Sequence, residues 1–174
     1  MTQAFQNFRN GFTLIDLIVS IGIFTMLATV SIANFRAGAN NDAVRQGATI
    51  AAQLARRAQT ATLSGAVLSD GTFPVGGYGI RLDGDSTGVI TLFADIDGNR
   101  DYTDASEDLE EVALPRNVVF GGGTLNIVFS SPDADVYFNG AASEASQTIN
   151  LSSPSADITQ AVIIYRLSGQ IRVQ

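Results

Sequence analysis

Four residue types are absent from this sequence, and three of them supply much of protein chemistry. The 174 residues include no cysteine, histidine or tryptophan, and the ten basic residues are all arginine. Without cysteine the chain can form no disulfide and no thiolate metal site, and without histidine it lacks the usual ligand of zinc and haem. Without lysine it can form no Schiff base. Catalysis would have to depend on carboxylates, hydroxyls and tyrosine, so the composition favours a protein that is not an enzyme.

Charge is also scarce, and the acids outnumber the bases. Charged residues make up 16% of the chain and the formal net charge is -7, whereas soluble domains typically contain about 25% charged residues. A nucleic-acid binder needs a cationic surface to meet the phosphates, so this composition argues against nucleic acid as a partner. Apolar residues make up 45% of the chain, which indicates a folded protein. A length of 174 residues predicts one domain with at most an appendage.

A long apolar run stands near the N-terminus. Residues 12–35 carry a single charge, on Asp16, and residues 17–35 carry none. A 24-residue helix is roughly 36 Å long, which is enough to cross a hydrocarbon core about 30 Å thick. A helix satisfies its backbone polar groups internally, as lipid requires. The run therefore predicts a transmembrane helix.

Two simpler interpretations compete with this one. A secretory signal peptide would have an apolar core of about 7–15 residues that ends in a small-residue cleavage site, whereas this run is longer and has a carboxylate near its start. A plain membrane anchor leaves Asp16 unexplained, because an acid at the centre of a bilayer helix costs about 2.5–3.5 kcal/mol. An acid within a membrane segment predicts a function and a partner.

The residues around Asp16 resemble a known processing signal. The stretch Gly-Phe-Thr-Leu-Ile-Asp-Leu-Ile-Val at residues 11–19 is similar to the class III signal of type IV pilins and pseudopilins. The resemblance implies that a prepilin peptidase cuts between Gly11 and Phe12, removes residues 1–11 as a leader peptide, and methylates the new amine. It also implies that Asp16 takes the place of the family's glutamate, which pairs with the N-terminal amine of a neighbouring subunit during assembly. Aspartate keeps the charge but is one methylene shorter.

The run is followed by an amphipathic segment, residues 36–65. Small residues from Val44 to Thr62 recur at three- and four-residue steps, which places them on one face of a helix. Gly38 with Asn40 and Asn41 predicts a bend or local melting between the two halves, and Gly65 predicts the end of the helix.

Residues 66–174 alternate between β-rich runs and clusters of glycine and polar residues. One helix followed only by strands predicts an α+β fold in which a long N-terminal helix packs on an antiparallel β-sheet domain. The expected strands are residues 79–82, 89–94, 111–114, 118–120, 124–129, 136–138, 148–151, 161–167 and 170–173.

The resemblance extends more loosely into this domain. Residues 51–61, 93–101 and 162–173 are similar to segments of minor pseudopilins of the GspH/FimT type. The resemblance implies a pilin-like fold and a minor subunit of a type IV pilus or a type II secretion pseudopilus. It also implies a single-pass protein of the bacterial cytoplasmic (inner) membrane whose β domain lies outside the cytoplasm. The implied partners are other pilin or pseudopilin subunits, the prepilin peptidase, the inner-membrane assembly platform, and membrane lipid before assembly.

Acidic residues gather between the second and third expected strands. Residues 95–111 hold eight acids and one base, Arg100, and Asp95, Asp97, Asn99 and Asp101 alternate along the chain. Calcium takes six to eight oxygen ligands, and EF-hand loops use a similar spacing. Two hypotheses follow. The segment is a solvated loop whose residues do turn chemistry, or it is a calcium site held by these four residues and Glu107.

A binding module is the alternative function. Arg166 and Arg172, near the C-terminus, are candidates for contact with DNA during uptake, as in some minor pilins, and the β domain could instead capture a surface ligand. An enzyme is less favoured, because the paired carboxylates lie in a Gly/Asn-rich loop that offers no aromatic platform for a sugar.

Overall fold

The computed structural model describes residues 13–84 and 88–174. Within these residues the chain forms one α-helix, one short 3-10 helix and nine β-strands. The α-helix, α1 (Leu14–Leu63), is 50 residues long. The chain divides into two compact units at Gly38–Ala39, and α1 contributes residues to both.

The helix ends as the glycine signal predicts. The N–H of Ala66 donates to the carbonyl of Ala61 (3.0 Å) and the N–H of Gly65 donates to that of Thr62 (3.2 Å). Gly65 has a φ of 63°. This is a Schellman motif, in which a left-handed residue reverses the chain and satisfies the last helical carbonyls.

The predicted local melting around residues 38–41 is wrong, because α1 is unbroken there. The two asparagines serve tertiary contacts instead. The Nδ2 of Asn40 donates to the carbonyl of Ser155 (2.8 Å), and the Oδ1 of Asn41 accepts from the N–H of Asp157 (3.0 Å). Their side chains therefore fasten the helix to a loop of the β domain and do not compete with the helical backbone.

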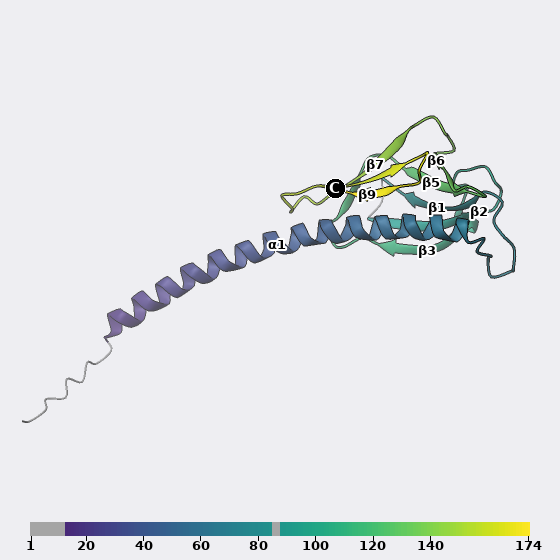
Figure 1. Cartoon of the computed structure of the whole chain (residues 1–174). Helices are drawn as coiled ribbons and strands as arrows, with labels where there is room; N and C mark the ends of the chain where they lie inside the picture. Colours follow the sequence, from purple (N-terminus) through teal and green to yellow (C-terminus); the bar gives the residue numbers. More distant parts are fainter. Residues whose placement is uncertain (1–12, 85–87) are drawn as a thin grey trace, which may run out of the picture. The chain divides into compact units, whose positions relative to one another are not determined.

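The nine strands form two antiparallel sheets. The five-stranded sheet has the order β3-β2-β1-β5-β6, and the four-stranded sheet has the order β4-β7-β8-β9. Figure 1 shows the strands lying along the blue second half of α1. The strands are β1 (Gly77–Leu82), β2 (Val89–Asp95), β3 (Asp108–Ala113), β4 (Val119–Gly121), β5 (Leu125–Ser130), β6 (Asp135–Phe138), β7 (Ser146–Ser152), β8 (Gln160–Tyr165) and β9 (Ile171–Val173). The 3-10 helix η1 (Ala105–Glu107) precedes β3.

The α+β prediction is confirmed, with one informative shift at a strand boundary. Each expected strand is present, but β3 begins at Asp108, three residues before its predicted start. Its residues pair with β2 through Phe93↔Asp108 and Thr91↔Glu111. β3 is an edge strand, where charged side chains are tolerated because they face water and discourage further pairing. The last acids of the predicted loop therefore belong to a strand.

Small side chains line the face of the helix that packs into the core of the β domain. The predicted apolar face of the helix is buried. At Gly47 the neighbouring side chains come so close that an added Cβ would lie 3.0 Å from Cγ1 of Val118 and 3.4 Å from Cδ2 of Leu151. These helix residues join a core that includes the inward-facing aliphatic side chains of both sheets. Alanine at the contact positions fills the space without holding the layers apart. The residues of this helix face are Val44, Ala48, Ala51, Ala55, Ala58 and Thr62.

Thr62 is the one polar member of that face. It is 3% exposed. Its hydroxyl donates to the carbonyl of Phe129 (2.9 Å) and accepts from the N–H of Tyr78 (3.0 Å). The last turns of α1 are thereby joined to β1 and β5. A buried hydroxyl requires such partners, because an unsatisfied one costs free energy.

We expect Thr62→Val to lower the free energy of unfolding by about 1–3 kcal/mol, because two buried backbone groups lose a partner while the side-chain shape is kept. Denaturant unfolding of the detergent-solubilised chain measures the change. Thr60→Val is the matched control, since Thr60 is exposed on the same helix and should change stability by less than about 0.5 kcal/mol. Equal effects of the two substitutions would contradict the role of the buried hydroxyl.

Candidate functional sites in the helix and the acidic loop

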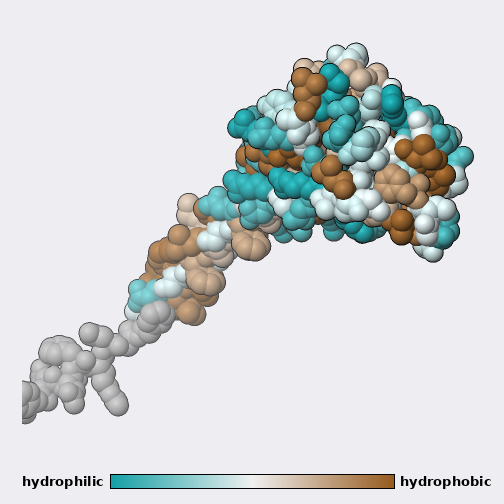
Figure 2. Space-filling view, turned by 45° about the vertical axis from the view of Figure 1, so that its right-hand side comes forward, coloured by the Kyte–Doolittle hydropathy of each residue, from teal (hydrophilic) through white to brown (hydrophobic). Residues whose placement is uncertain are grey.

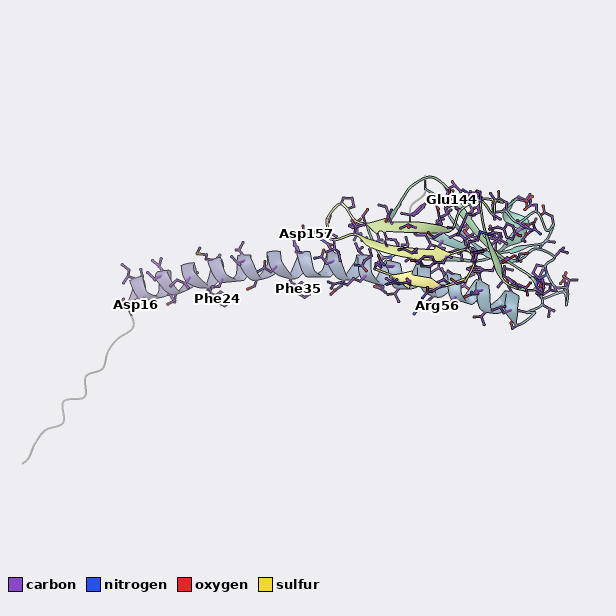
Figure 3. All side chains as sticks on the ribbon, turned by 45° about the horizontal axis from the view of Figure 1, so that its top comes forward. Asp16, Phe24, Phe35, Arg56, Glu144 and Asp157 are labelled. Carbon is purple, nitrogen blue, oxygen red and sulfur yellow. The ribbon has the colours of Figure 1, made fainter. Side chains whose placement is uncertain are left out.

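The N-terminal part of α1 is apolar on every side and uncovered. Thirteen large apolar side chains between Leu14 and Phe35 are each at least 50% exposed, and Phe24 and Phe35 are 74% and 78% exposed. Figure 2 shows this segment as mainly brown with some white and teal patches, and Figure 3 shows its side chains pointing outward around the helix. A helix without a polar face is normally buried in a protein core or in lipid. This segment therefore requires a lipid or protein environment that the described chain does not supply.

The segment is long and apolar enough to cross a membrane by length and composition. The core helix of a soluble protein can pass the same test, but such a helix is covered by its own chain. Here none of the most apolar 18-residue window is buried. The N-terminal helix is therefore a candidate membrane span.

Three hydroxyl groups within the apolar segment are satisfied by the helix itself. Thr25, Thr29 and Ser31 donate to the carbonyls four residues earlier, at 2.7, 2.8 and 2.9 Å. A hydroxyl in hydrocarbon has no water to bond, so this local pairing lowers the cost of transferring the segment out of water.

Thr13 and Asp16 together cap the start of the helix. Its Oδ2 accepts from the hydroxyl of Thr13 (2.6 Å) and from the N–H of Thr13 (3.2 Å), and its own N–H donates to the Thr13 hydroxyl (3.3 Å). This reciprocal pairing is a capping box, with threonine at the cap and an acid three residues later. The Thr-x-x-Asp spacing is readable in the sequence, so this local role could have been predicted. Gly11 and Phe12, the predicted processing residues, lie outside the described residues.

Two buried carboxylates organise the acidic loop. Asp95 is fully buried and accepts from the N–H groups of Gly98 and Arg100, each at 2.8 Å. Glu107 is 3% exposed and accepts from the N–H groups of Ile96 (3.1 Å) and Thr103 (2.8 Å). Burial raises the pKa of Asp95, two backbone N–H donors oppose that shift, and the nearby charge of Glu107 adds to it. These carboxylates do the turn chemistry that one of the two hypotheses predicts.

Asp97 completes a group of three acids. Its Oδ1 accepts from the N–H of Asn99 (3.0 Å), and its Oδ2 accepts from the Asn99 amide (3.1 Å) and the Thr103 hydroxyl (3.0 Å). The Asn99 N–H, as the largest cause, and the Thr103 hydroxyl lower the pKa of Asp97. One oxygen from each of Asp95, Asp97 and Glu107 lies within 4.8 Å of the others, a grouping that could hold a cation.

The other two predicted ligands lie differently. Asn99 is hydrogen-bonded to Asp97, two residues earlier in the chain. The side-chain oxygen of Asn99 accepts from the N–H of Asp101 (2.7 Å). The carboxylate of Asp101 accepts from the side-chain amide of Asn126 (2.7 Å) and from the N–H of Tyr102 (2.9 Å). Asp101 thus ties the loop to β5, and it is not among the grouped acids.

Residues 95–107, which we call the strap, also cover part of the outer face of the five-stranded sheet. Tyr102 packs edge-on against buried Phe93 with ring centroids 5.3 Å apart, and the guanidinium of Arg100 lies 4.4 Å from the ring centroid of Tyr137. The Phe93 ring lies over Gly79, where a Cβ would come within 2.6 Å of it. Sequence reasoning missed this role, because it depends on the pairing of β1 with β2.

The two arginines that are candidates for contact with DNA differ in their exposure. Arg172 is exposed in β9. Arg166 is half-buried, and its Nε is enclosed without a hydrogen-bond partner in the described part of the chain.

The calcium hypothesis predicts a higher melting temperature in millimolar calcium than in EDTA, because a ligand that binds only the folded state at a hundred times its Kd adds about 2.7 kcal/mol of stability. The measurement is a thermal melt of the full chain in detergent. Asp97→Asn should abolish the difference, and Glu144→Gln, at an exposed acid elsewhere, should keep it. An unchanged melting temperature of the natural chain would remove the hypothesis.

Comparison of the chain with protein-family models, with curated proteins and with solved structures finds no match. The pilin resemblance therefore depends on the residues of this chain alone.

Proposed function

We propose that the chain is a structural minor subunit of a type IV pilus or a type II secretion pseudopilus that is processed by a prepilin peptidase and assembled through its N-terminal helix. The observation that carries the proposal is the apolar, uncovered segment between Leu14 and Phe35. That segment continues without a break into the amphipathic half of α1, which contributes to the core of the β domain. One helix thus combines a surface that needs an apolar environment with an anchor for a water-soluble domain.

The proposed mechanism is an exchange of apolar environments. In the bilayer the segment contacts lipid, and in a filament it would contact the same segment of neighbouring subunits. Because lipid is as apolar as the helices, their association depends on packing and on the few polar groups available. The paired hydroxyls of Thr25, Thr29 and Ser31 present no unsatisfied donor to either environment.

Asp16 is the one acid of the segment, and we propose that its charge sets the register between subunits. A carboxylate in an apolar environment is costly unless it meets a cation. The N-terminal amine of a neighbouring mature subunit is the proposed cation, and the described bonds of the capping box use only the Oδ2 of Asp16.

The alternative is a minor pilin that binds DNA or a surface ligand through its β domain. Exposed Arg172 is compatible with a phosphate contact, but the net charge of -7 opposes one. A gel shift at physiological salt separates the two proposals, since retarded DNA would favour the binding module.

Mass spectrometry of the protein from its native host tests the processing step. The expected mature chain begins at Phe12 and carries one methyl group on its amine. An intact Met1 terminus, or a terminus at another residue without methylation, would overturn the proposed function.

Three substitutions at Asp16 separate its charge from its capping role. Asp16→Asn keeps a side-chain oxygen for Thr13 but removes the charge, so we expect normal membrane insertion and loss of filament incorporation. Asp16→Glu should assemble, because it restores the family's acid, and Asp16→Ala should fail. Incorporation is measured in sheared filaments, and insertion is measured in membrane fractions. Normal incorporation of Asp16→Asn would show that the cap, and not the charge, is what assembly needs.

A further inference from the structure

The end of the β domain at which α1 ends carries exposed apolar side chains. Five of them, which we call the apolar end, are each at least 46% exposed: Leu63, Val67, Val75, Ile96 and Leu167. A single exposed aliphatic residue is ordinary, whereas a gathered set indicates a contact surface. Hydrogen bonds beneath these side chains bring them to one end of the domain.

Val75 and Ile96 come together where β1 begins and β2 ends. The N–H of Gly76 donates to the carbonyl of Asp95 (2.9 Å), and each of the two apolar residues is the neighbour of one of these bonded residues. The Cγ1 of Val75 also lies 3.1 Å from the position of a Cβ on Gly98. Val75 therefore lies against the start of the strap, to which Ile96 belongs.

Tyr78 joins the same end of the sheet to the end of α1. Its N–H donates to the hydroxyl of Thr62 (3.0 Å), and its phenol donates to the carbonyl of Ala66 (2.8 Å). Leu63 and Val67 are the residues that follow these two acceptors. They therefore lie at the end of the domain that Val75 and Ile96 occupy.

Leu167 lies in the turn between β8 and β9. The carbonyl of Gly169 in this turn accepts from the Nε2 of Gln59 (3.1 Å), and Gln59 precedes Leu63 by about one turn of α1. The turn thus lies beside the last turns of the helix. Leu167 is 80% exposed, whereas its neighbour Arg166 is half-buried.

Exposed carboxylates lie in the two loops that supply the apolar end. Asp70 is in the loop before β1, and Asp97 and Asp104 are in the strap. Hydrogen bonds from Thr72 lower the pKa of Asp70, and hydrogen bonds from Ser106 lower that of Asp104. These carboxylates are therefore ionised at neutral pH. An apolar surface with such a rim attracts a partner of opposite charge.

We propose that the apolar end docks a segment of another protein that carries aliphatic or aromatic side chains flanked by lysine or arginine. The aliphatic side chains of the apolar end would cover the apolar part of that segment, and the carboxylates would attract its flanks. A second copy packed face to face would bring the same acids together, and an anionic lipid surface would repel them. The proposal goes beyond the assembly function and does not depend on it, because none of these residues lies in the apolar segment of α1.

Photocrosslinking in the native host tests the proposal. The photoreactive residue p-benzoylphenylalanine replaces Val75 or Leu167 in the full chain, and mass spectrometry reads the peptide that illumination attaches. We expect a peptide of another protein in which apolar residues stand next to lysine or arginine. Val119 is the matched control position, because it is 40% exposed but lies in β4 next to Val118, whose side chain faces Gly47 of α1. Attachment to lipid, to a second copy or to a peptide without basic residues, equal attachment at Val119, or no attachment would overturn the proposal.

Two variants separate the apolar contact from the charge. With the photoreactive residue at Val75, we expect Leu167→Ser to lower the crosslinking yield about tenfold, and the double variant Asp70→Asn with Asp104→Asn to lower it to a similar extent. All three positions are exposed, so the variants should fold. Asp157→Asn, at the exposed acid labelled in Figure 3, should leave the yield unchanged. An unchanged yield in either of the first two variants would overturn the proposal.

Discussion

The packing of an alanine-rich helix face into one core with the residues of both sheets is the contact on which the β domain depends. Ala48, Ala51, Ala55 and Ala58 are fully buried. Gly47 has no side chain, which leaves space for the side chain of Val118, the residue just before β4. The inner faces of both sheets share this core with the helix, because the aliphatic residues of a sheet need a second layer. A larger side chain at these positions would separate the layers and open cavities.

This packing gives one helix two opposite requirements. The second half of α1 is covered and is fixed by side-chain bonds from Asn40, Asn41, Thr62 and Arg57, the last paired with Glu110 of β3. The first half exposes its large apolar side chains and has no polar face among the described residues, so it needs an apolar environment supplied by other molecules. Because a helix satisfies its backbone internally, it can pass from one environment to the other without a loop. The proposed assembly function follows from this combination.

Sequence periodicity was sufficient for the local elements and insufficient for the contacts between distant ones. The helix, its end at Gly65 and the strands could be predicted, because their signals lie within a few residues of one another. The early start of β3 could not, since Asp108 and Glu110 resemble loop residues until the edge position of the strand is known. The orientation of the Asp101 side chain depends on a hydrogen bond from Asn126, which lies 25 residues away in the sequence. The packing of Tyr102 on Phe93 depends on the absence of a side chain at Gly79, in a neighbouring strand.

The acidity of the strap has a structural explanation that needs no ligand. A carboxylate offers two equivalent oxygens, and Asp95 and Glu107 use both to accept four backbone N–H groups from a segment that has no ladder partner. An amide in either position would turn its NH2 group toward one of those donors. Burial raises the pKa of Asp95, the neighbouring acids add to that shift, and the N–H groups of Arg100 and Gly98 oppose it. The density of acids in a loop is therefore weak evidence for a metal.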